Sequence, residues 1–457
     1  MNHRFLTGSA AVALAIGLAF AGPALAQAPA PAADQTPAPP PHPMVGPVMF
    51  SGYVDAGTSV NFDSPANNYN FGELFEDRAN SFRMNQLVLE AEKDLDPAAT
   101  GMDWGFKVEG LYGTDARYTH SIGLWSLETH SPYQFDFVEF NAQAHVPVIA
   151  TGGIDFKAGI YTTPIGYEVV NATGNFFYSH NYITNFAIPI KHTGILSTTH
   201  VNDLLDLWLG VDTGINGFLP THSGDNNSSE AVLAGFGINN PIPNMTILAL
   251  AHVGAEDPYN KSNSSQYFSG AGKAQDGNRH TRQIFDVTST YKINDSWSVA
   301  NETTFDKDDL GVENCANRLT CHSGATAEGT AFYGIYTLND QWSFGARGEI
   351  FRDDQGFYVA GFGSAQDFMR VEQASGAGPN TVYAPGKATY GDLTIGANYK
   401  PPLPPLPLNA GLTIRPEFRW DHAWGTPGSN KQFSMNSAGV NTSNDSYLFS
   451  VDAIFGF

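Results

Sequence analysis

Charge is scarce in this 457-residue sequence, and most of it has one sign. Only 15% of the residues are Asp, Glu, Lys or Arg, and 45 acidic side chains oppose 23 basic ones, for a formal net charge of −22. Nucleic-acid binding requires clustered Lys and Arg that neutralise phosphates. The scarcity of cations therefore argues against nucleic acid as a partner.

Motifs for catalysis and cofactor binding are also missing. The sequence has no glycine-rich phosphate loop, no Cys or His pairs with zinc spacing and no Gly-x-Ser-x-Gly elbow. An outer-membrane hydrolase would have to use Ser179-His180, His192 or His200. Adjacent Ser and His are weak evidence for a triad, because nucleophile and base must meet in space with an orienting third group. We expect no enzyme activity, no cofactor and no metal.

Long apolar runs are absent beyond the first residues. His3 and Arg4, an apolar run over residues 10–20 and the small residues before Gln27 are typical of a signal peptide spanning residues 1–26. The apolar run is shorter than the roughly 20 residues that a membrane-spanning helix needs. The Pro- and Ala-rich segment 27–47 predicts an extended periplasmic linker. Residues 48–457 then form the exported domain.

Only two cysteines occur, Cys315 and Cys321, separated by five residues. An exported chain meets an oxidising compartment, so these residues predict a disulfide that closes a small external loop. A metal site there would need more ligands than the adjacent His322 supplies.

What the sequence does have is a two-residue period. In the segment Asp136–Val146 the odd positions from Glu139 on are polar, and most even positions are apolar. In Leu412–Asp421 the even positions are apolar and the odd positions are mostly charged. Successive strand residues face opposite sides, so each strand has one apolar and one polar face. A soluble sandwich also alternates, so this period alone favours a membrane barrel only modestly.

Connection lengths favour the barrel more strongly. Short links such as Asn202-Asp203, Asn294-Asp295 and Asn339-Asp340 alternate with long ones such as 61–81 and 354–387, as in outer-membrane barrels. We therefore predict an all-β fold, a transmembrane antiparallel up-and-down β-barrel of about 16 strands with short periplasmic turns and long external loops. The predicted strands begin near Val48, Phe82, Met102, Phe135, Gly153, Thr193, Leu205, Glu230, Met245, His280, Ser296, Ala327, Gln341, Ala388, Ala410 and Asn444.

Two internal repeats support this topology. Tyr291–Ser298 matches Tyr336–Ser343, and in both segments Tyr and Trp flank an Asn-Asp turn, where an interfacial aromatic belt would lie. A propeller blade would instead have four short strands per repeat. The second repeat is the pattern Arg-x-Glu-x-x-x-Asp, which occurs in two later strands. Its charges must face the lumen, either as a structural ladder or as an ion-selectivity element; the charged residues of these strands are Arg347, Glu349, Asp353, Arg415, Glu417, Arg419 and Asp421.

The last strand ends in phenylalanine and has an apolar face at every second position. This pattern resembles the terminal strand by which bacterial outer-membrane proteins are recognised for insertion, and its residues are Tyr447, Phe449, Val451, Phe455 and Phe457. We expect the outer-membrane insertion machinery, membrane lipid and lipopolysaccharide as partners, and the outer membrane as the location.

From Val48 to Phe457 the sequence resembles the OmpL-like β-barrel porin family of Gram-negative bacteria. The residues that carry the resemblance are "FSGYVDAG" (Phe50–Gly57), "GIYTTPIGYE" to "IPIKHTGI" (Gly159–Ile195), "RPEFRWD" (Arg415–Asp421) and the terminal Phe457. The resemblance implies a diffusion channel and no particular substrate. General porins, a more distant comparison, are often homotrimers whose third external loop folds into the lumen.

The third predicted external loop, residues 162–192, is the candidate constriction of a water-filled channel for small hydrophilic solutes or ions. Pro164 and Gly166 would turn the chain off the wall, and Phe176, Phe177 and Tyr178 would anchor it. Glu168, Lys191 and His192 would place charge near the narrowest point. An outward cap is the alternative for the loop. A sugar-specific porin, with aromatic rings that stack on sugars, and an adhesin or structural barrel are the alternatives for the function.

Overall fold

The computed structural model describes most of the exported part of the chain. The described residues are 44–45, 47–96, 99–121, 124, 131–219, 229–256, 281–308, 324–359, 387–404, 406, 410–426 and 430–457. The predicted signal peptide and nearly all of the predicted linker lie outside them. So do Cys315 and Cys321.

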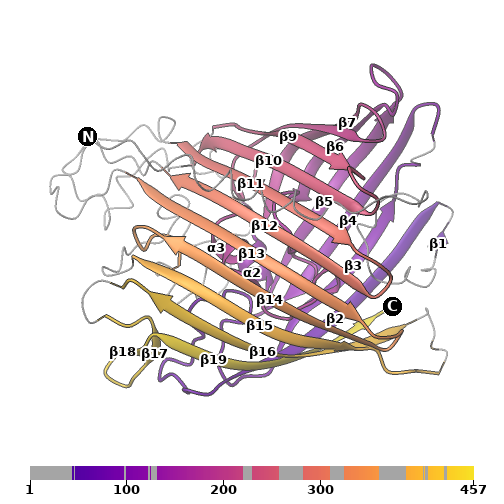
Figure 1. Ribbon diagram of the computed structural model, residues 1–457. Coiled ribbons are helices and arrows are strands. Elements are labelled where there is room, and N and C mark those ends of the chain that lie inside the picture. The colour runs from indigo at the N-terminus through magenta and orange to yellow at the C-terminus, as the bar shows by residue number, and fades with distance from the viewer. Residues whose placement is uncertain are drawn as a thin grey trace.

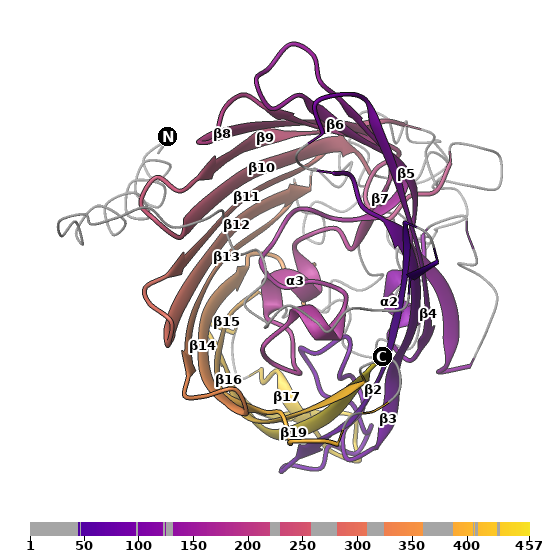
Figure 2. The ribbon, with the colours of Figure 1, turned by 90° about the vertical axis from the view of Figure 1, so that its right-hand side faces the viewer.

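Sixteen long antiparallel strands form one closed barrel, as predicted (Figures 1 and 2). Each strand pairs with its neighbours in sequence, and the last pairs with the first, so the sheet has no free edge. The strands are β2 (Val48–Asn61), β3 (Arg83–Lys93), β4 (Asp103–Gly113), β5 (Gln134–Val146), β6 (Ile154–Thr162), β7 (Lys191–His200), β8 (Leu205–Asp212), β9 (Ala231–Asn239), β10 (Met245–Ala255), β11 (Thr281–Lys292), β12 (Trp297–Asp308), β13 (Ala325–Thr337), β14 (Trp342–Asp353), β15 (Ala388–Tyr399), β16 (Gly411–Trp424) and β19 (Asp445–Gly456).

Smaller elements accompany the barrel. β1 (Met44–Val45) pairs with the start of β2, and β17 (Phe433–Met435) pairs with β18 (Asn441–Ser443) between β16 and β19. The helical elements of the described part are α2 (Ala116–Thr119), α3 (Tyr182–Phe186) and the single 3₁₀ turn η1 (Ala172–Gly174). Among the described residues, no helix has the length and apolarity needed to cross a membrane.

The short turns are built by their asparagines. The Asn294 side chain accepts hydrogen bonds from the backbone N–H groups of Ser296 and Trp297, both at 2.9 Å. Asn339 makes the same pair of bonds, also at 2.9 Å, in the repeated turn. An Asn side chain that bonds to its own backbone two residues on mimics a backbone turn, which is why these positions reverse the chain tightly. The two turns thus share one local geometry as well as one sequence pattern.

Aromatic rings gather beside these turns. The Trp297 and Tyr336 ring centroids lie 4.9 Å apart, and those of Trp342 and Tyr399 lie 4.3 Å apart. Farther along the strands the outward positions are exposed and apolar, as at Ile350. An apolar band bordered by aromatic residues is the outer surface that a membrane barrel requires.

The alternation predicted for β16 matches its burial, because Arg415, Glu417, Arg419 and Asp421 are buried and Phe418 is exposed. The alternation predicted for β5 is interrupted. Glu139 pairs with Glu109 and Phe137 with Gly110, so Val138 is an extra residue between two paired positions. Such a β-bulge shifts the inward register by one residue. Even positions therefore face inward before the bulge, and odd positions do so after it.

Candidate functional site: the loop across the barrel interior

Residues 163–190, here called L3, connect β6 to β7 and lie inside the barrel, where Figure 2 shows α3 within the ring of strands. L3 bonds to side chains of β14 and β16. Because β14 lies halfway around the closed sheet from β6, L3 reaches the far wall before it returns to β7.

Two wall carboxylates hold successive backbone N–H groups of L3. Glu417 on β16 accepts hydrogen bonds from the N–H groups of Tyr178 at 2.9 Å and Ser179 at 3.1 Å. Glu349 on β14 accepts from those of Tyr182 at 2.7 Å and Ile183 at 3.0 Å. A carboxylate that accepts from backbone N–H groups makes charge-assisted bonds, which are roughly twice as strong as neutral ones.

Three wall guanidinium groups hold the carbonyl groups of the same loop. Arg347 donates to the carbonyl of Ser179 at 2.7 Å, and Arg419 donates to that of His180 at 2.6 Å. Arg415 donates to the carbonyls of Ala172 at 2.8 Å and Asn175 at 2.7 Å. The Arg and Glu side chains of these two strands therefore bond to donors and acceptors of one loop backbone.

Each of these arginines is buried and also has acidic partners. Arg347 lies 2.5 Å from Asp392 and 2.8 Å from Glu168, and Arg415 lies 2.5 Å from Asp452. Arg419 lies 2.8 Å from Asp421 and 2.9 Å from Glu73. Paired charges are the condition under which burial of an arginine is tolerable.

The three residues predicted to place charge at the narrowest point are themselves buried. Glu168 accepts hydrogen bonds from Arg347 at 2.8 Å and from the Asn181 N–H at 2.9 Å. Lys191 donates to Asp136 at 2.5 Å and to a carbonyl of β5 at 2.8 Å. His192 is fully buried beside Asp212, 3.1 Å away. The charges of Glu168 and Lys191 are thus engaged within the protein, and all three side chains hold L3 near its two ends.

The chain turns off the wall at Pro164 and Gly166. Gly166 has a φ of +98°, which favours glycine, and its N–H donates to Asp286 at 3.3 Å. A side chain other than hydrogen at Gly166 would also contact Ile188, because a Cβ there would lie 2.4 Å from the Ile188 Cδ1 atom.

The predicted anchoring residues pack against glycines of the inner wall. A Cβ at Gly345 would lie 2.3 Å from the Phe176 ring, one at Gly57 would lie 2.8 Å from the Tyr178 ring, and one at Gly396 would lie 3.3 Å from the Phe177 ring. The absence of wall side chains at these positions gives the three rings room to approach the sheet.

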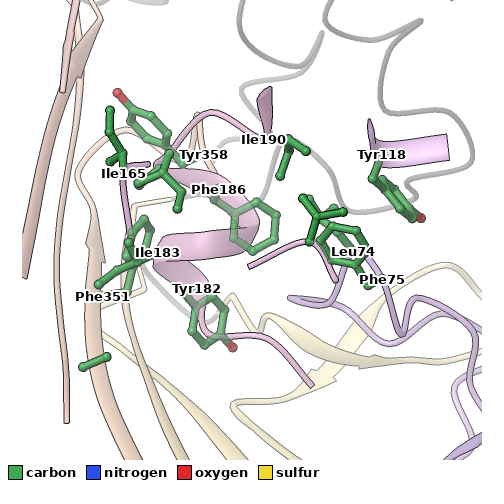
Figure 3. Close-up of a cluster of buried hydrophobic side chains, with 14 of the residues drawn as sticks. Leu74, Phe75, Tyr118, Ile165, Tyr182, Ile183, Phe186, Ile190, Phe351 and Tyr358 are labelled. Carbon is green, nitrogen blue, oxygen red and sulfur yellow. The ribbon is translucent and has the colours of Figure 1, made fainter. Parts of the chain in front are cut away.

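The helix α3 completes the loop's own packing. Its N-cap residue Asn181 accepts a hydrogen bond from the Thr184 N–H at 2.6 Å. Tyr182, Ile183 and Phe186 belong to a cluster of buried apolar side chains that includes Phe351 of β14 (Figure 3). L3 is thus held by apolar contacts as well as by ionic ones.

Other external loops also enter the interior, which the sequence pattern did not indicate. Residues 62–82 contribute Asp77, and residues 114–121 contribute Arg117, whose guanidinium bonds to Asp77 at 2.9 and 3.0 Å. The predicted lumen residue Asp353 accepts backbone hydrogen bonds from five residues of the segment 354–359, which are Gln355, Gly356, Phe357, Tyr358 and Val359.

One titratable pair lies between two of these loops. The His180 Nδ1 atom is 3.6 Å from the Glu76 Oε1 atom. Burial raises the pKa of Glu76 well above its usual range, and the nearby carboxylates Asp115 and Glu417 raise it further. Burial lowers the pKa of His180. Both shifts favour the neutral forms, so this pair adds little charge to the interior.

The residues of the predicted insertion signal lie on the last strand. Tyr447, Phe449 and Phe455 are exposed on the outer face of β19. Phe457 exchanges two backbone hydrogen bonds with Gly52 of β2, at 2.8 and 2.9 Å. These bonds extend the pairing that closes the barrel.

Comparisons with known proteins agree with this architecture. Residues 47–457 match the family described as "Putative beta-barrel porin-2, OmpL-like". No curated protein sequence matches the chain. Solved structures with a similar fold include an anion-selective porin from Comamonas acidovorans, at 12% identity and a TM-score of 0.51, covering 90% of this chain and 99% of that one.

Two further porin structures are similar. The outer-membrane channel DcaP of Acinetobacter baumannii has 11% identity and a TM-score of 0.50, with 90% of this chain and 97% of that one covered. The trimer form of OmpT from Vibrio cholerae has 12% identity and a TM-score of 0.50, with 90% and 99% covered. At such low identity these likenesses show a shared fold only.

Proposed function

Since the chain belongs to the OmpL-like family of β-barrel porins, we propose that this outer-membrane porin passes small hydrophilic solutes or ions through a bore that L3 narrows. Barrels of about 16 strands are wide enough to leave an aqueous channel. The role proposed is passive diffusion without catalysis.

The observation that carries the proposal is the attachment of L3 to the far wall. The loop begins at β6 and ends at β7, yet Glu349 and Glu417 hold its backbone from β14 and β16. A segment that spans the interior in this way reduces the cross-section open to solutes.

The same contacts make L3 a permanent constriction rather than a lid. Moving the loop away would leave the buried Glu349, Glu417 and three arginines without their backbone partners. A buried polar group that loses its partner costs about 1–3 kcal/mol, and more if it is charged. The summed cost opposes an opened loop.

The acidic interior supports a preference for cations. Among the described residues, buried Asp and Glu outnumber buried Lys and Arg, and the whole chain has the same bias. An excess of acidic groups in the wall around a water-filled bore raises the local concentration of cations. Glu168, Arg347, Arg415 and Arg419 act in this proposal by holding the loop in place.

A homotrimer is the assembly we propose. Its support is the trimer form of OmpT, a barrel of similar fold. The mass of the folded complex in a defined detergent, corrected for bound detergent, tests it. A monomer mass in mild detergent would contradict the proposal.

Reconstitution of folded protein into planar bilayers tests the function. We expect discrete conductance steps and, across a salt gradient, a reversal potential of the sign that indicates cation preference. Absence of steps from protein shown to be folded would overturn the channel. Anion preference would overturn the role of the acidic interior and leave the channel intact.

A further inference from the structure

Three residues that are distant in sequence meet on the inner wall where L3 returns to the barrel. His192 on β7, Asp212 on β8 and His252 on β10 are all buried, and one nitrogen or oxygen atom of each lies within 4.8 Å of the others. The His192 Nδ1 atom is 3.1 Å from Asp212 Oδ2, and the His252 Nε2 atom is 3.0 Å from Asp212 Oδ1.

We propose that His192, Asp212 and His252 bind one divalent first-row transition metal ion, with Zn²⁺ as the reference ion. Two imidazoles and one carboxylate form a ligand set that suits such ions. Ligand atoms about 2.0–2.2 Å from a tetrahedral Zn²⁺ are roughly 3.3 Å from each other. The two nitrogen–oxygen separations are close to that value.

An unused polar atom of the site favours a bound cation over a set of simple hydrogen bonds. His192 Nδ1 is close to Asp212 but has no aligned hydrogen bond, whereas His252 Nε2 lies at hydrogen-bond distance from both Asp212 oxygens, at 3.0 and 3.2 Å. Buried polar atoms normally have partners. An ion shared with Asp212 would satisfy the His192 nitrogen.

The surroundings already orient one ligand. The other ring nitrogen of His192, Nε2, lies 2.9 Å from the Thr163 hydroxyl, so Nδ1 is the atom turned toward Asp212. The Tyr161 ring stacks on the His192 ring with centroids 5.6 Å apart. A partner on the second nitrogen fixes ring orientation and tautomer in metal-binding histidines.

Small residues of the wall create the space. A Cβ at Gly194 would lie 2.7 Å from the Asp212 Cβ atom, and one at Gly254 would lie 2.4 Å from that of Ala231. Ala231 stands between Asp212 and Gly254 in the sheet, and His252 pairs with Leu233, so the small Ala231 side chain leaves a diagonal path from Asp212 to His252. The ligand side chains can therefore converge across an intervening strand.

The consequence for the protein is a second attachment of L3. Lys191 binds β5, and the next residue, His192, would bind a metal shared with β8 and β10. The inference does not depend on the channel proposal, because metal binding is measured without any conductance.

Titration of chelator-treated, folded wild-type protein with Co²⁺ tests the site, with visible absorption as the readout and Zn²⁺ as the competitor. We expect one Co²⁺ per chain and its displacement by Zn²⁺. The variants His192→Ala, His252→Ala and Asp212→Asn should lose this band, and Thr163→Val should weaken binding roughly 10–100-fold. His422→Ala is the matched control, because His422 also lies beside a carboxylate, 2.7 Å from Asp445, but without a second histidine among the described ligands.

Two results would overturn the site. One is the absence of stoichiometric binding by wild-type protein. The other is binding that persists in the folded His192→Ala, Asp212→Asn and His252→Ala variants, which would show adventitious binding elsewhere. If those variants fail to fold, X-ray absorption of the Zn²⁺-loaded wild type decides. Two imidazoles with oxygen ligands at about 2.0–2.2 Å support the site, and a sulfur or all-oxygen set contradicts it.

Discussion

The inner wall of the barrel has two sides of different chemistry. On β14 and β16 most of the inward positions are charged, as at Arg347 and Glu417. On β9, β10 and β11 they include the buried apolar residues Leu233, Leu250 and Ile284. The charged side makes most of the wall bonds to the backbone of L3, whereas β11 contributes one, from the Gly166 N–H to Asp286, and the apolar residues pack into the buried cluster.

On β14 and β16, inward charge meets the need of a loop backbone. An irregular loop has N–H and C=O groups that lack secondary-structure partners, and inside a barrel they need side-chain partners or water. The side of the wall that L3 reaches supplies carboxylates and guanidiniums. Charge at these positions therefore supports the fold of the loop as well as any selectivity.

The largest effect should follow from the loss of an arginine on the charged side. Arg347→Ala removes the partner of the buried Asp392 and Glu168, so we expect a loss of about 3–5 kcal/mol of unfolding free energy. Denaturant unfolding in detergent measures it. Arg352→Ala, on the outer face of the same strand, is the control and should cost about 1 kcal/mol or less. Equal losses would contradict the comparison.

Truncation of a side chain on the apolar side should lower the stability of the barrel without changing its conductance. Leu250→Ala leaves a cavity beside Gly235 and should cost about 2–5 kcal/mol, with an unchanged single-channel conductance because L3 keeps its attachments. Leu209→Ala, at an exposed outward position of β8, should cost less. An altered conductance in folded Leu250→Ala protein would show that the two sides are coupled.

A smaller effect is expected from filling one of the wall glycines. Gly345→Val places a side chain where the Phe176 ring lies, so overpacking should cost about 1–3 kcal/mol and loosen the middle of L3. Gly348→Val, on the same strand with open space around its Cβ position, is the matched control. Limited proteolysis within L3 reads out the loosening, and identical cleavage of both variants would refute it.

Much of the fold could be predicted from the sequence because alternating apolar and polar residues indicate which side of a barrel strand faces lipid and which faces the lumen. All sixteen predicted starts lie within two residues of a strand start in the structure, and the Asn-Asp turns lie where expected. The bulge at Val138 escaped prediction, because an extra residue shifts the register without an unusual composition. The alternation of residue types can be read from one strand alone, whereas a bulge depends on how that strand pairs with its neighbour.

The candidate site was less predictable. The position of L3 in the count of loops suggested an inward fold, but the bonds from Glu417 to Tyr178 and Ser179 join residues more than 200 positions apart. Contacts between such residues depend on closure of the barrel, and the alternation of residues within single strands cannot predict them. Gly345 at an inward position was one available signal, because a lumen-facing glycine indicates close approach of another segment.

The residues of the proposed metal site illustrate the same limit. No short segment of the sequence has zinc spacing, because His192, Asp212 and His252 come from three different strands. The sequence clue was an inward-facing histidine in the otherwise apolar run of β10. Only the sheet register brings it near Asp212.

The role of L3 in setting the bore is tested by the single-channel conductance of the double variant Glu349→Ala and Glu417→Ala. The variant removes the four hydrogen bonds that the two wall carboxylates accept from backbone N–H groups of L3, each worth about 1.5–3 kcal/mol. Glu328→Ala, an exposed glutamate of β13, is the control. We predict a larger conductance for the folded double variant and the wild-type value for the control. A folded double variant with wild-type conductance would contradict the claim that wall-held L3 sets the bore.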